Sequence, residues 1–228
     1  MTDLLLLRHA LPVSGHADPG LSEVGQAQAE RVAQWLTGRH IDAVVTSPLR
    51  RARETAAVIE AALKLTAEVV PDLREWELDD PDYVYDAVED MAADDPRLLA
   101  VAEGRYDDFV PQLDTVAFQR RTVSAIESVF ARYNHGETVV VSTHGGFISA
   151  YLGYVIGSHQ VMWFNAEYTG ISRVTRMPGG RVVVRSVNET GHLEIPPRAG
   201  PDRRLSTDPD VRPQVTGVSD YERGRRLG

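Results

Sequence analysis

Two short apolar runs of this 228-residue chain each end in a histidine, and this repeated arrangement strongly constrains the fold. Residues 4–9 read Leu-Leu-Leu-Leu-Arg-His, and residues 139–144 read Val-Val-Val-Ser-Thr-His. Both runs have the length and composition of buried strands. In an open parallel sheet, residues at the carboxyl ends of strands lie at the edge where ligands bind. We therefore expect Arg8, His9 and His144 to meet at one edge of a sheet.

Helical and strand-like segments alternate along the rest of the chain. The apolar spacing predicts helices at 21–39, 48–65, 115–136 and 147–157, further strands at 41–47 and 67–73, and a hairpin at 171–188. Ser22 is a candidate N-cap, Pro48 fits a first helical turn, and Gly136 fits a helix end. This alternation predicts an α/β fold, a three-layer sandwich with a mainly parallel central sheet flanked by helices.

The composition divides the chain into three parts. Residues 72–114 contain fifteen Asp or Glu, three Arg and no Lys, and we interpret them as an inserted acidic helical cap with helices at Tyr83–Met91 and Arg97–Glu103. Residues 1–195 are expected to form a single domain that includes this cap. Residues 196–228 are rich in Pro, Arg, Asp and Gly, and we expect an extended or disordered tail.

Composition also excludes several classes of function. Without cysteine, the chain has no disulfide, no thiolate metal site and no thiol nucleophile. A formal charge of −9 argues against a general nucleic-acid binder. The four leucines are too few for a membrane span or a signal sequence, so we expect a cytoplasmic protein without membrane contact. Trp163, Phe164 and Tyr168 fit a core, a pocket wall or a subunit contact, which leaves a homodimer open.

A group of arginines completes the pattern at the sheet edge. Arg50, Arg51 and Arg53 lie in the helix that follows strand 41–47. If the strands are parallel neighbours, two histidines, at least one arginine and a helix N-terminus converge, which suits a dianionic phosphate group. Each feature alone has a simpler interpretation as a polar loop, a structural histidine or a solvated helix face. The phosphate interpretation depends on their joint occurrence.

The motifs "LRHA", "LSEVGQAQA", "TSPLRRARETA", "LREWE" and "VVVSTHGG" resemble those of the histidine phosphatase superfamily, the phosphoglycerate mutase-like proteins, in its phosphatase branch. The resemblance spans about residues 3–195. Ala10 replaces the usual glycine of the Arg-His-Gly motif. Pro12 and Gly15 stand where many members have threonine and asparagine, so some phosphate contacts should come from Ser14, His16 or backbone N–H groups.

The resemblance, together with the chemistry of these side chains, implies a set of roles. His9 is the nucleophile that forms a phosphohistidine. Arg8 and Arg51 bind the phosphate and keep His9 unprotonated, because a like charge lowers a histidine pKa. His144, as an imidazolium beside the bound dianion, binds and stabilises the transferred group. Positioning and charge then suffice for phosphoryl transfer, and no metal or cofactor is expected.

The resemblance also points to a proton donor. Glu75 in "LREWE" is the candidate general acid, which would later activate water. Glu77 is a rival two residues away, and in an extended segment the two side chains would point to opposite faces. The expected function is hydrolysis of a small-molecule phosphomonoester.

Other functions stay open at this point. A cofactor-dependent phosphoglycerate mutase is one, although a cap with few cations argues against it. A protein phosphohistidine phosphatase and a catalytically silent binding protein of the same fold are others. A metal hydrolase built on His9, His16 and His144 is the last, but it lacks a nearby carboxylate-rich ligand cluster.

Overall fold

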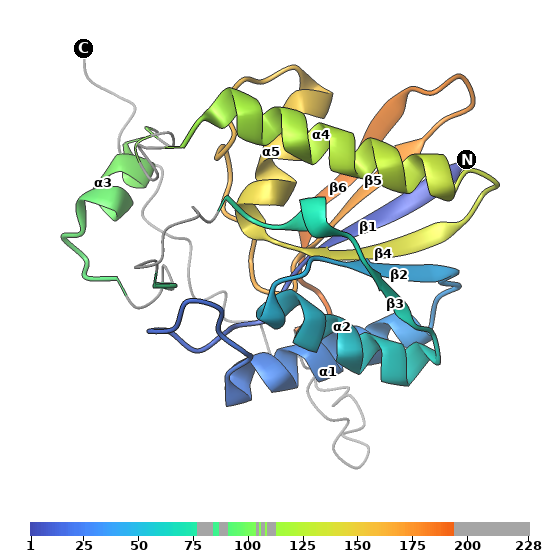
Figure 1. Ribbon diagram of the computed structural model, residues 1–228, viewed down its shortest axis with the longest axis horizontal. Coiled ribbons are helices and arrows are strands. Elements are labelled where there is room, and N and C mark those ends of the chain that lie inside the picture. The colour runs from blue at the N-terminus through green and yellow to red at the C-terminus, as the bar shows by residue number, and fades with distance from the viewer. Residues whose placement is uncertain (77–83, 87–90, 104, 106–107, 109–112, 194–228) are drawn as a thin grey trace, which may run out of the picture. The chain divides into compact units, whose positions relative to one another are not determined.

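The computed structural model describes residues 1–76, 84–86, 91–103, 105, 108 and 113–193, in which six strands form one sheet with helices on both faces (Figure 1). The elements follow in the order β1 (Thr2–Arg8), α1 (Glu23–Thr37), β2 (Ala43–Thr46), α2 (Arg50–Leu63), β3 (Ala67–Val69), the 3-10 helix η1 (Pro71–Leu73), α3 (Pro96–Ala102), α4 (Thr115–Arg132), β4 (Thr138–Thr143), α5 (Gly145–Ile156), β5 (Ile171–Arg176) and β6 (Val182–Glu189). The predicted strands and the predicted hairpin are present, but the strand expected at 67–73 ends at Val69, and Pro71–Leu73 form η1 instead.

The sheet has the strand order β3-β2-β4-β1-β5-β6. Strands β3, β2, β4 and β1 are parallel, whereas β5 runs antiparallel to β1 and β6 antiparallel to β5. The prediction of an α/β fold with a mainly parallel central sheet is therefore confirmed. Within this sheet, β1 and β4 are hydrogen-bonded neighbours, so the two runs that end in histidine lie side by side.

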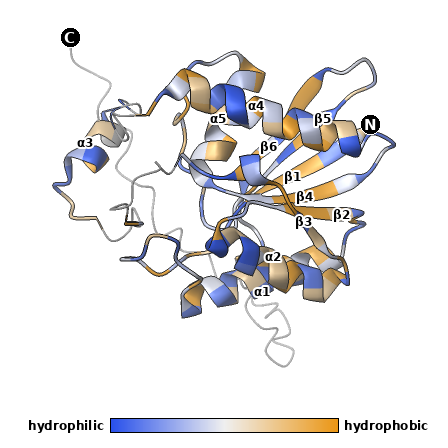
Figure 2. Cartoon of the chain, in the orientation of Figure 1, coloured by the Kyte–Doolittle hydropathy of each residue, from blue (hydrophilic) through white to orange (hydrophobic). Residues whose placement is uncertain are grey.

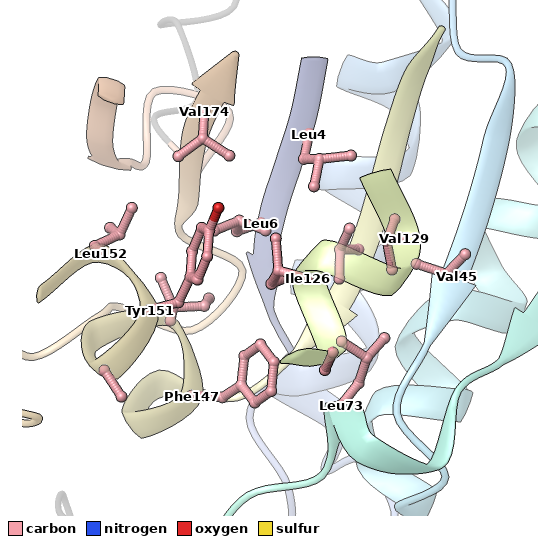
Figure 3. Packing of buried hydrophobic residues seen from close by; sticks show 14 of the residues in the cluster. Leu4, Leu6, Val45, Leu73, Ile126, Val129, Phe147, Tyr151, Leu152 and Val174 are labelled. Atoms are coloured by element: carbon pink, nitrogen blue, oxygen red, sulfur yellow. The ribbon is translucent and has the colours of Figure 1, made fainter. Parts of the chain in front are cut away.

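Strand β1 is buried on both faces, which explains its four leucines. Leu5 and Leu7 pack with residues of α1 and α2, and Leu4 and Leu6 pack on the other face with residues of α4 and α5. Figure 3 shows this second cluster, and Figure 2 shows the central strands as mostly hydrophobic. Each leucine is at most 3% exposed, and burying such a side chain stabilises the fold by about 1.5–3 kcal/mol. Strand β1 is thereby held firmly in the middle of the core.

The loop after β1 is fixed to α1 by the residues of the "LSEVGQAQA" motif. The backbone N–H of Leu11 donates to the side chain of Gln28 at 2.9 Å, and its carbonyl accepts from the backbone N–H and the hydroxyl of Ser22. Ser22 also caps α1, as predicted, by accepting from the Gly25 N–H. A Cβ on Gly25 would lie 2.0 Å from the Leu11 carbonyl oxygen, so only glycine permits this approach.

Two predicted helix ends differ in the structure. Helix α2 begins at Arg50 with Leu49 as an extended N-cap, because the Leu49 carbonyl is the first acceptor of the helix; Pro48 precedes the helix and is not in its first turn. Helix α4 ends at Arg132, and Gly136 lies beyond its C-cap in a turn with φ +109°.

The acidic cap is described only in part. Helix α3 confirms most of the helix expected at 97–103. In the segment expected to form a helix at 83–91, the described residues Val84–Asp86 are not helical, and the others, Met91 apart, lie outside the described residues. Contacts divide the chain into a unit of Met1–Glu194 and a unit of Ile195–Gly228. The second unit lies outside the described residues, so the expectation of an extended or disordered tail stays a prediction.

Candidate active site

The carboxyl ends of β1 and β4 place two buried histidine rings beside each other. Arg8 and Thr143 are paired in the parallel register, so the residues that follow them, His9 and His144, are neighbours across the sheet edge. Their ring centroids are 5.1 Å apart, with an angle of 61° between the planes. The backbone N–H of His9 donates to the Thr143 carbonyl at 2.8 Å, and this bond fixes the end of the strand that carries the ring.

The hydrogen bonds of His9 assign its tautomer. Nδ1 lies 2.8 Å from the Ala10 carbonyl oxygen, which can only accept, so Nδ1 carries the proton. Nε2 then holds the lone pair, and it accepts a hydrogen bond of 3.2 Å from Nε of Arg51. Arg51 comes from the first turn of α2 and is 1% exposed. The nitrogen that is able to attack an electrophile therefore faces a buried guanidinium.

Burial and two cations keep the His9 ring neutral. Desolvation lowers the pKa of His9 well below its usual value, and the charges of Arg51 and then Arg8 lower it further. An imidazole acts as a nucleophile only when it is unprotonated. The ring is consequently in its reactive form at neutral pH.

Arg8 brings a second buried guanidinium to the same edge. Its Nη1 donates to the Ala166 carbonyl, and its guanidinium carbon lies 3.7 Å from the centroid of the Tyr168 ring. Within the described part of the chain, Nε of Arg8 is buried and has no hydrogen-bond partner. A buried donor of this kind suits an anionic oxygen.

His144 is the N-cap residue of α5 and is fully buried. Its Nε2 lies 2.7 Å from the hydroxyl of Ser47, whereas its buried Nδ1 has no partner among the residues that the structure describes. Burial, and then the charges of Arg51 and Arg8, lower the pKa of His144 well below its usual value. The expected imidazolium therefore requires a bound dianion, because the protein around the ring favours the neutral form.

Glu75 follows the short helix η1 in the chain, and its side chain contacts the N-terminus of α5. The residue is 7% exposed, and its Oε2 accepts from the Gly146 N–H at 2.9 Å. Arg121 of α4 fixes this segment by donating to the carbonyls of Asp72, Arg74 and Glu75 at 2.7 to 2.9 Å. The carboxyl group is thus bound to the backbone of Gly146, two positions after the N-cap His144. The rival donor, Glu77, lies outside the described residues.

Gly146 leaves room for the indole ring of Trp76, the residue after Glu75. A Cβ on Gly146 would lie 1.6 Å from the Trp76 ring, so we expect Gly146→Ala to displace the indole and to destabilise the fold by about 1–3 kcal/mol. Chemical denaturation followed by tryptophan fluorescence measures this change. Gly38→Ala is the matched control, since the nearest atom to its Cβ would be 3.8 Å away. Equal stability of the two variants would contradict the expected clash.

The N-terminus of α2 is not free for a ligand as the sequence suggested. Oδ1 of Asp18 accepts from the Arg50 N–H at 2.8 Å and lies 3.9 Å from Nη1 of Arg51. A carboxylate is favourable at this position because helix N-termini carry partial positive charge. Of the three arginines of this helix, only Arg51 is buried; Arg50 and Arg53 are exposed.

Two tyrosines at the site were not identified as site residues from the sequence. The sequence predicts Tyr168 in a core, a pocket wall or a subunit contact, and Tyr85 in a helix. Their ring centroids lie 5.8 Å and 6.5 Å, respectively, from that of His9. No motif marks either residue, so the sequence held no signal that would have found them. His16, a candidate phosphate contact, is exposed.

The described residues offer neither a metal cluster nor a membrane helix. Within these residues, no group of three or more His, Asp or Glu side chains is arranged to hold a metal ion. Among the described helices, none is both long and apolar enough to cross a bilayer.

The chain is similar to known phosphatases in sequence and in fold. The chain is 31% identical over 207 residues to phosphoserine phosphatase 1 of Hydrogenobacter thermophilus, covering 85% of this chain and 95% of the relative. It is 28% identical over 207 residues to a metal-independent phosphoserine phosphatase of Arabidopsis thaliana, covering 85% and 84% of the two chains. The solved phosphoserine phosphatase of Entamoeba histolytica shares the fold, with a TM-score of 0.66 at 22% identity over 85% of this chain and 100% of that one.

A family comparison covers most of the chain. The family model described as histidine phosphatase superfamily (branch 1) matches residues 4–189. This range includes the four proposed site residues His9, Arg51, Glu75 and His144. The chain therefore belongs to the histidine phosphatase superfamily.

Proposed function

We propose that this phosphatase hydrolyses a small phosphomonoester through a phosphohistidine formed at Nε2 of His9. The observation that carries the proposal is the hydrogen bond from Nδ1 to the Ala10 carbonyl, which leaves the lone pair on Nε2. That nitrogen lies beside Arg51, and the ring is neutral because burial and two cations lower its pKa. A neutral, fixed imidazole between two guanidinium groups is suited to attack a phosphoryl group.

Binding of the phosphate also frees the nucleophile. Nε of Arg51 donates to the Nε2 lone pair of His9, over a rather long 3.2 Å. A dianionic phosphoryl group draws the donors of Arg51 and Arg8 to its own oxygens, because charge-assisted bonds to an anion are stronger. Nδ1 of His144 supplies a further contact. The Nε2 lone pair is then available to the phosphorus atom.

The reaction proceeds in two steps. Nε2 of His9 forms a bond to phosphorus as the ester oxygen leaves, and Glu75 gives that oxygen its proton. Glu75, now a carboxylate, takes a proton from water, whose oxygen attacks the phosphohistidine. Phosphate leaves, and the neutral His9 and the protonated Glu75 are restored.

The cap favours hydrolysis of a monophosphate over mutase chemistry. A mutase holds a bisphosphorylated intermediate and needs cations for the second phosphate. Two of the three arginines in residues 72–114 are paired with carboxylates: Arg97 with Asp86 and Asp95, and Arg105 with Glu103 and Asp108. They therefore contribute little net positive charge. The similarity to two phosphoserine phosphatases makes phosphoserine the first substrate to test.

The test is a phosphate-release assay with phosphoserine, 3-phosphoglycerate and glucosyl-3-phosphoglycerate, each with and without EDTA. We expect phosphate release from at least one ester and no effect of the chelator. Conversion of 3-phosphoglycerate to 2-phosphoglycerate in the presence of a trace of 2,3-bisphosphoglycerate would identify a mutase instead. Absence of turnover across a wider panel of phosphomonoesters would indicate a binding protein.

A further inference from the structure

Two tyrosines from distant parts of the chain meet beside the nucleophile. The hydroxyl oxygens of Tyr85 and Tyr168 are 3.2 Å apart, within hydrogen-bond distance. Both rings lie near His9, at centroid distances of 6.5 Å and 5.8 Å. We call this pair the tyrosine arch, and neither residue belongs to the motifs that carry the family resemblance.

Each half of the tyrosine arch covers one phosphate-binding arginine. The guanidinium carbon of Arg8 is 3.7 Å from the centroid of the Tyr168 ring, and that of Arg51 is 4.8 Å from the centroid of the Tyr85 ring. Cations at such distances from a ring face are attracted by its quadrupole. The arch is therefore fixed directly to the two cations proposed to hold the phosphoryl group.

The two halves differ in how firmly the backbone holds them. Tyr168 is 5% exposed, and the next residue, Thr169, donates from its N–H to the carbonyls of Arg8 and His9 at 3.1 and 3.3 Å. Thr169 has φ +57°, a conformation that a β-branched residue rarely adopts. Tyr168 is thus part of the rigid framework around the nucleophile.

Tyr85 is half-buried and is held by an exposed loop. Its carbonyl accepts from the Gly15 N–H at 3.1 Å, and its N–H donates to the His16 carbonyl at 2.9 Å. Gly15 has φ +83°, which a side chain would disfavour. The loop after β1, which also carries the nucleophile at its start, therefore positions this half of the arch.

We propose that the tyrosine arch selects the leaving group of the substrate, admitting small alkyl esters and rejecting aryl esters. The inference rests on the proposed phosphomonoesterase activity. With the hydroxyls at hydrogen-bond distance, no group passes between them, so a flat ring on the ester oxygen collides with the arch.

The test compares kcat/KM for two alkyl esters, phosphoserine and 3-phosphoglycerate, with kcat/KM for p-nitrophenyl phosphate and naphthyl phosphate. We expect Tyr85→Ala to raise the aryl-to-alkyl ratio by about tenfold or more, a typical effect of reshaping a pocket. Tyr85→Phe keeps the ring and removes only the hydroxyl, so it should keep the aryl exclusion if the bulk of the ring is what rejects aryl esters. Tyr154→Ala, which removes an exposed tyrosine of α5, is the matched control.

The outcomes separate the two proposals. A ratio for Tyr85→Ala within about twofold of the wild type, with thermal unfolding unchanged, would overturn the role of the arch, since contacts that discriminate usually exceed that. A wild-type protein that prefers aryl esters would also overturn it. A wild-type protein that hydrolyses none of the four esters would instead count against the proposed function itself.

Discussion

His9→Ala is expected to lower kcat/KM for any phosphomonoester substrate by about three to six orders of magnitude, because it removes a covalent nucleophile. Brief incubation of the wild type with a labelled substrate, followed by alkaline quenching, should trap a phosphohistidine, and the variant should trap none. The pKa of His9 is lowered by burial, Arg51 and Arg8, so the ring stays unprotonated below its usual titration range. Activity that depends on this group should accordingly persist below pH 6.5, the ordinary histidine value, and be lost only at more acidic pH.

His159→Ala is the matched control for this variant, because His159 is exposed and lies outside the site. It should keep wild-type activity and the label. Retention of a tenth of the activity by His9→Ala, or equal labelling of both variants, would contradict the assignment of Nε2 as the attacking atom. Thermal unfolding of both variants separates a lost nucleophile from a lost fold.

Glu75→Gln is expected to lower kcat/KM for alkyl esters by about a hundredfold to ten-thousandfold, the usual contribution of a positioned general acid. The amide oxygen of glutamine is able to accept from the Gly146 N–H as the carboxylate does, so the geometry at the start of α5 should be preserved. In a Tyr85→Ala background, which is expected to admit aryl esters, the first step with p-nitrophenyl phosphate needs little protonation of its leaving group and should be much less affected. A comparison of label formation from the two kinds of ester in single-turnover experiments measures this difference.

Glu30→Gln is the control, since Glu30 is an exposed residue of α1. An equal loss of label formation for both kinds of ester would contradict proton donation by Glu75. It would indicate that the carboxylate acts through its bond to α5 instead. No loss for either ester would indicate that another residue is the general acid, and Glu77 would be the next to test.

The sheet and its helices were predictable because their sequence patterns agree with their burial. Strands β1 and β4 are continuous apolar runs, as expected for strands covered on both faces. The family motifs then identified Arg51 among three neighbouring arginines, and it is the buried one. Local sequence was therefore sufficient to predict elements with a regular apolar pattern and site residues that lie in a family motif.

Other features depend on contacts that local sequence does not encode. The neutral state that the surroundings of His144 favour follows from complete burial beside cations, which requires three-dimensional placement. The bond from the Arg50 N–H to Asp18 joins residues that are 32 positions apart. The sequence predicts Tyr85 in a helix, but its backbone N–H and carbonyl instead bond to the backbone of His16 and Gly15. Long-range contacts decided each of these points.

The pairing of Arg8 with Thr143 sets the spacing of the two histidines. Adjacent strands lie about 4.8 Å apart in any sheet, so the separation of the rings is inherited from backbone geometry and owes nothing to the connections between elements. Insertions or deletions in those connections leave the two histidines in register. A lineage built on this plan is free to acquire new substrates by exchanging its surface segments while the reaction itself stays the same.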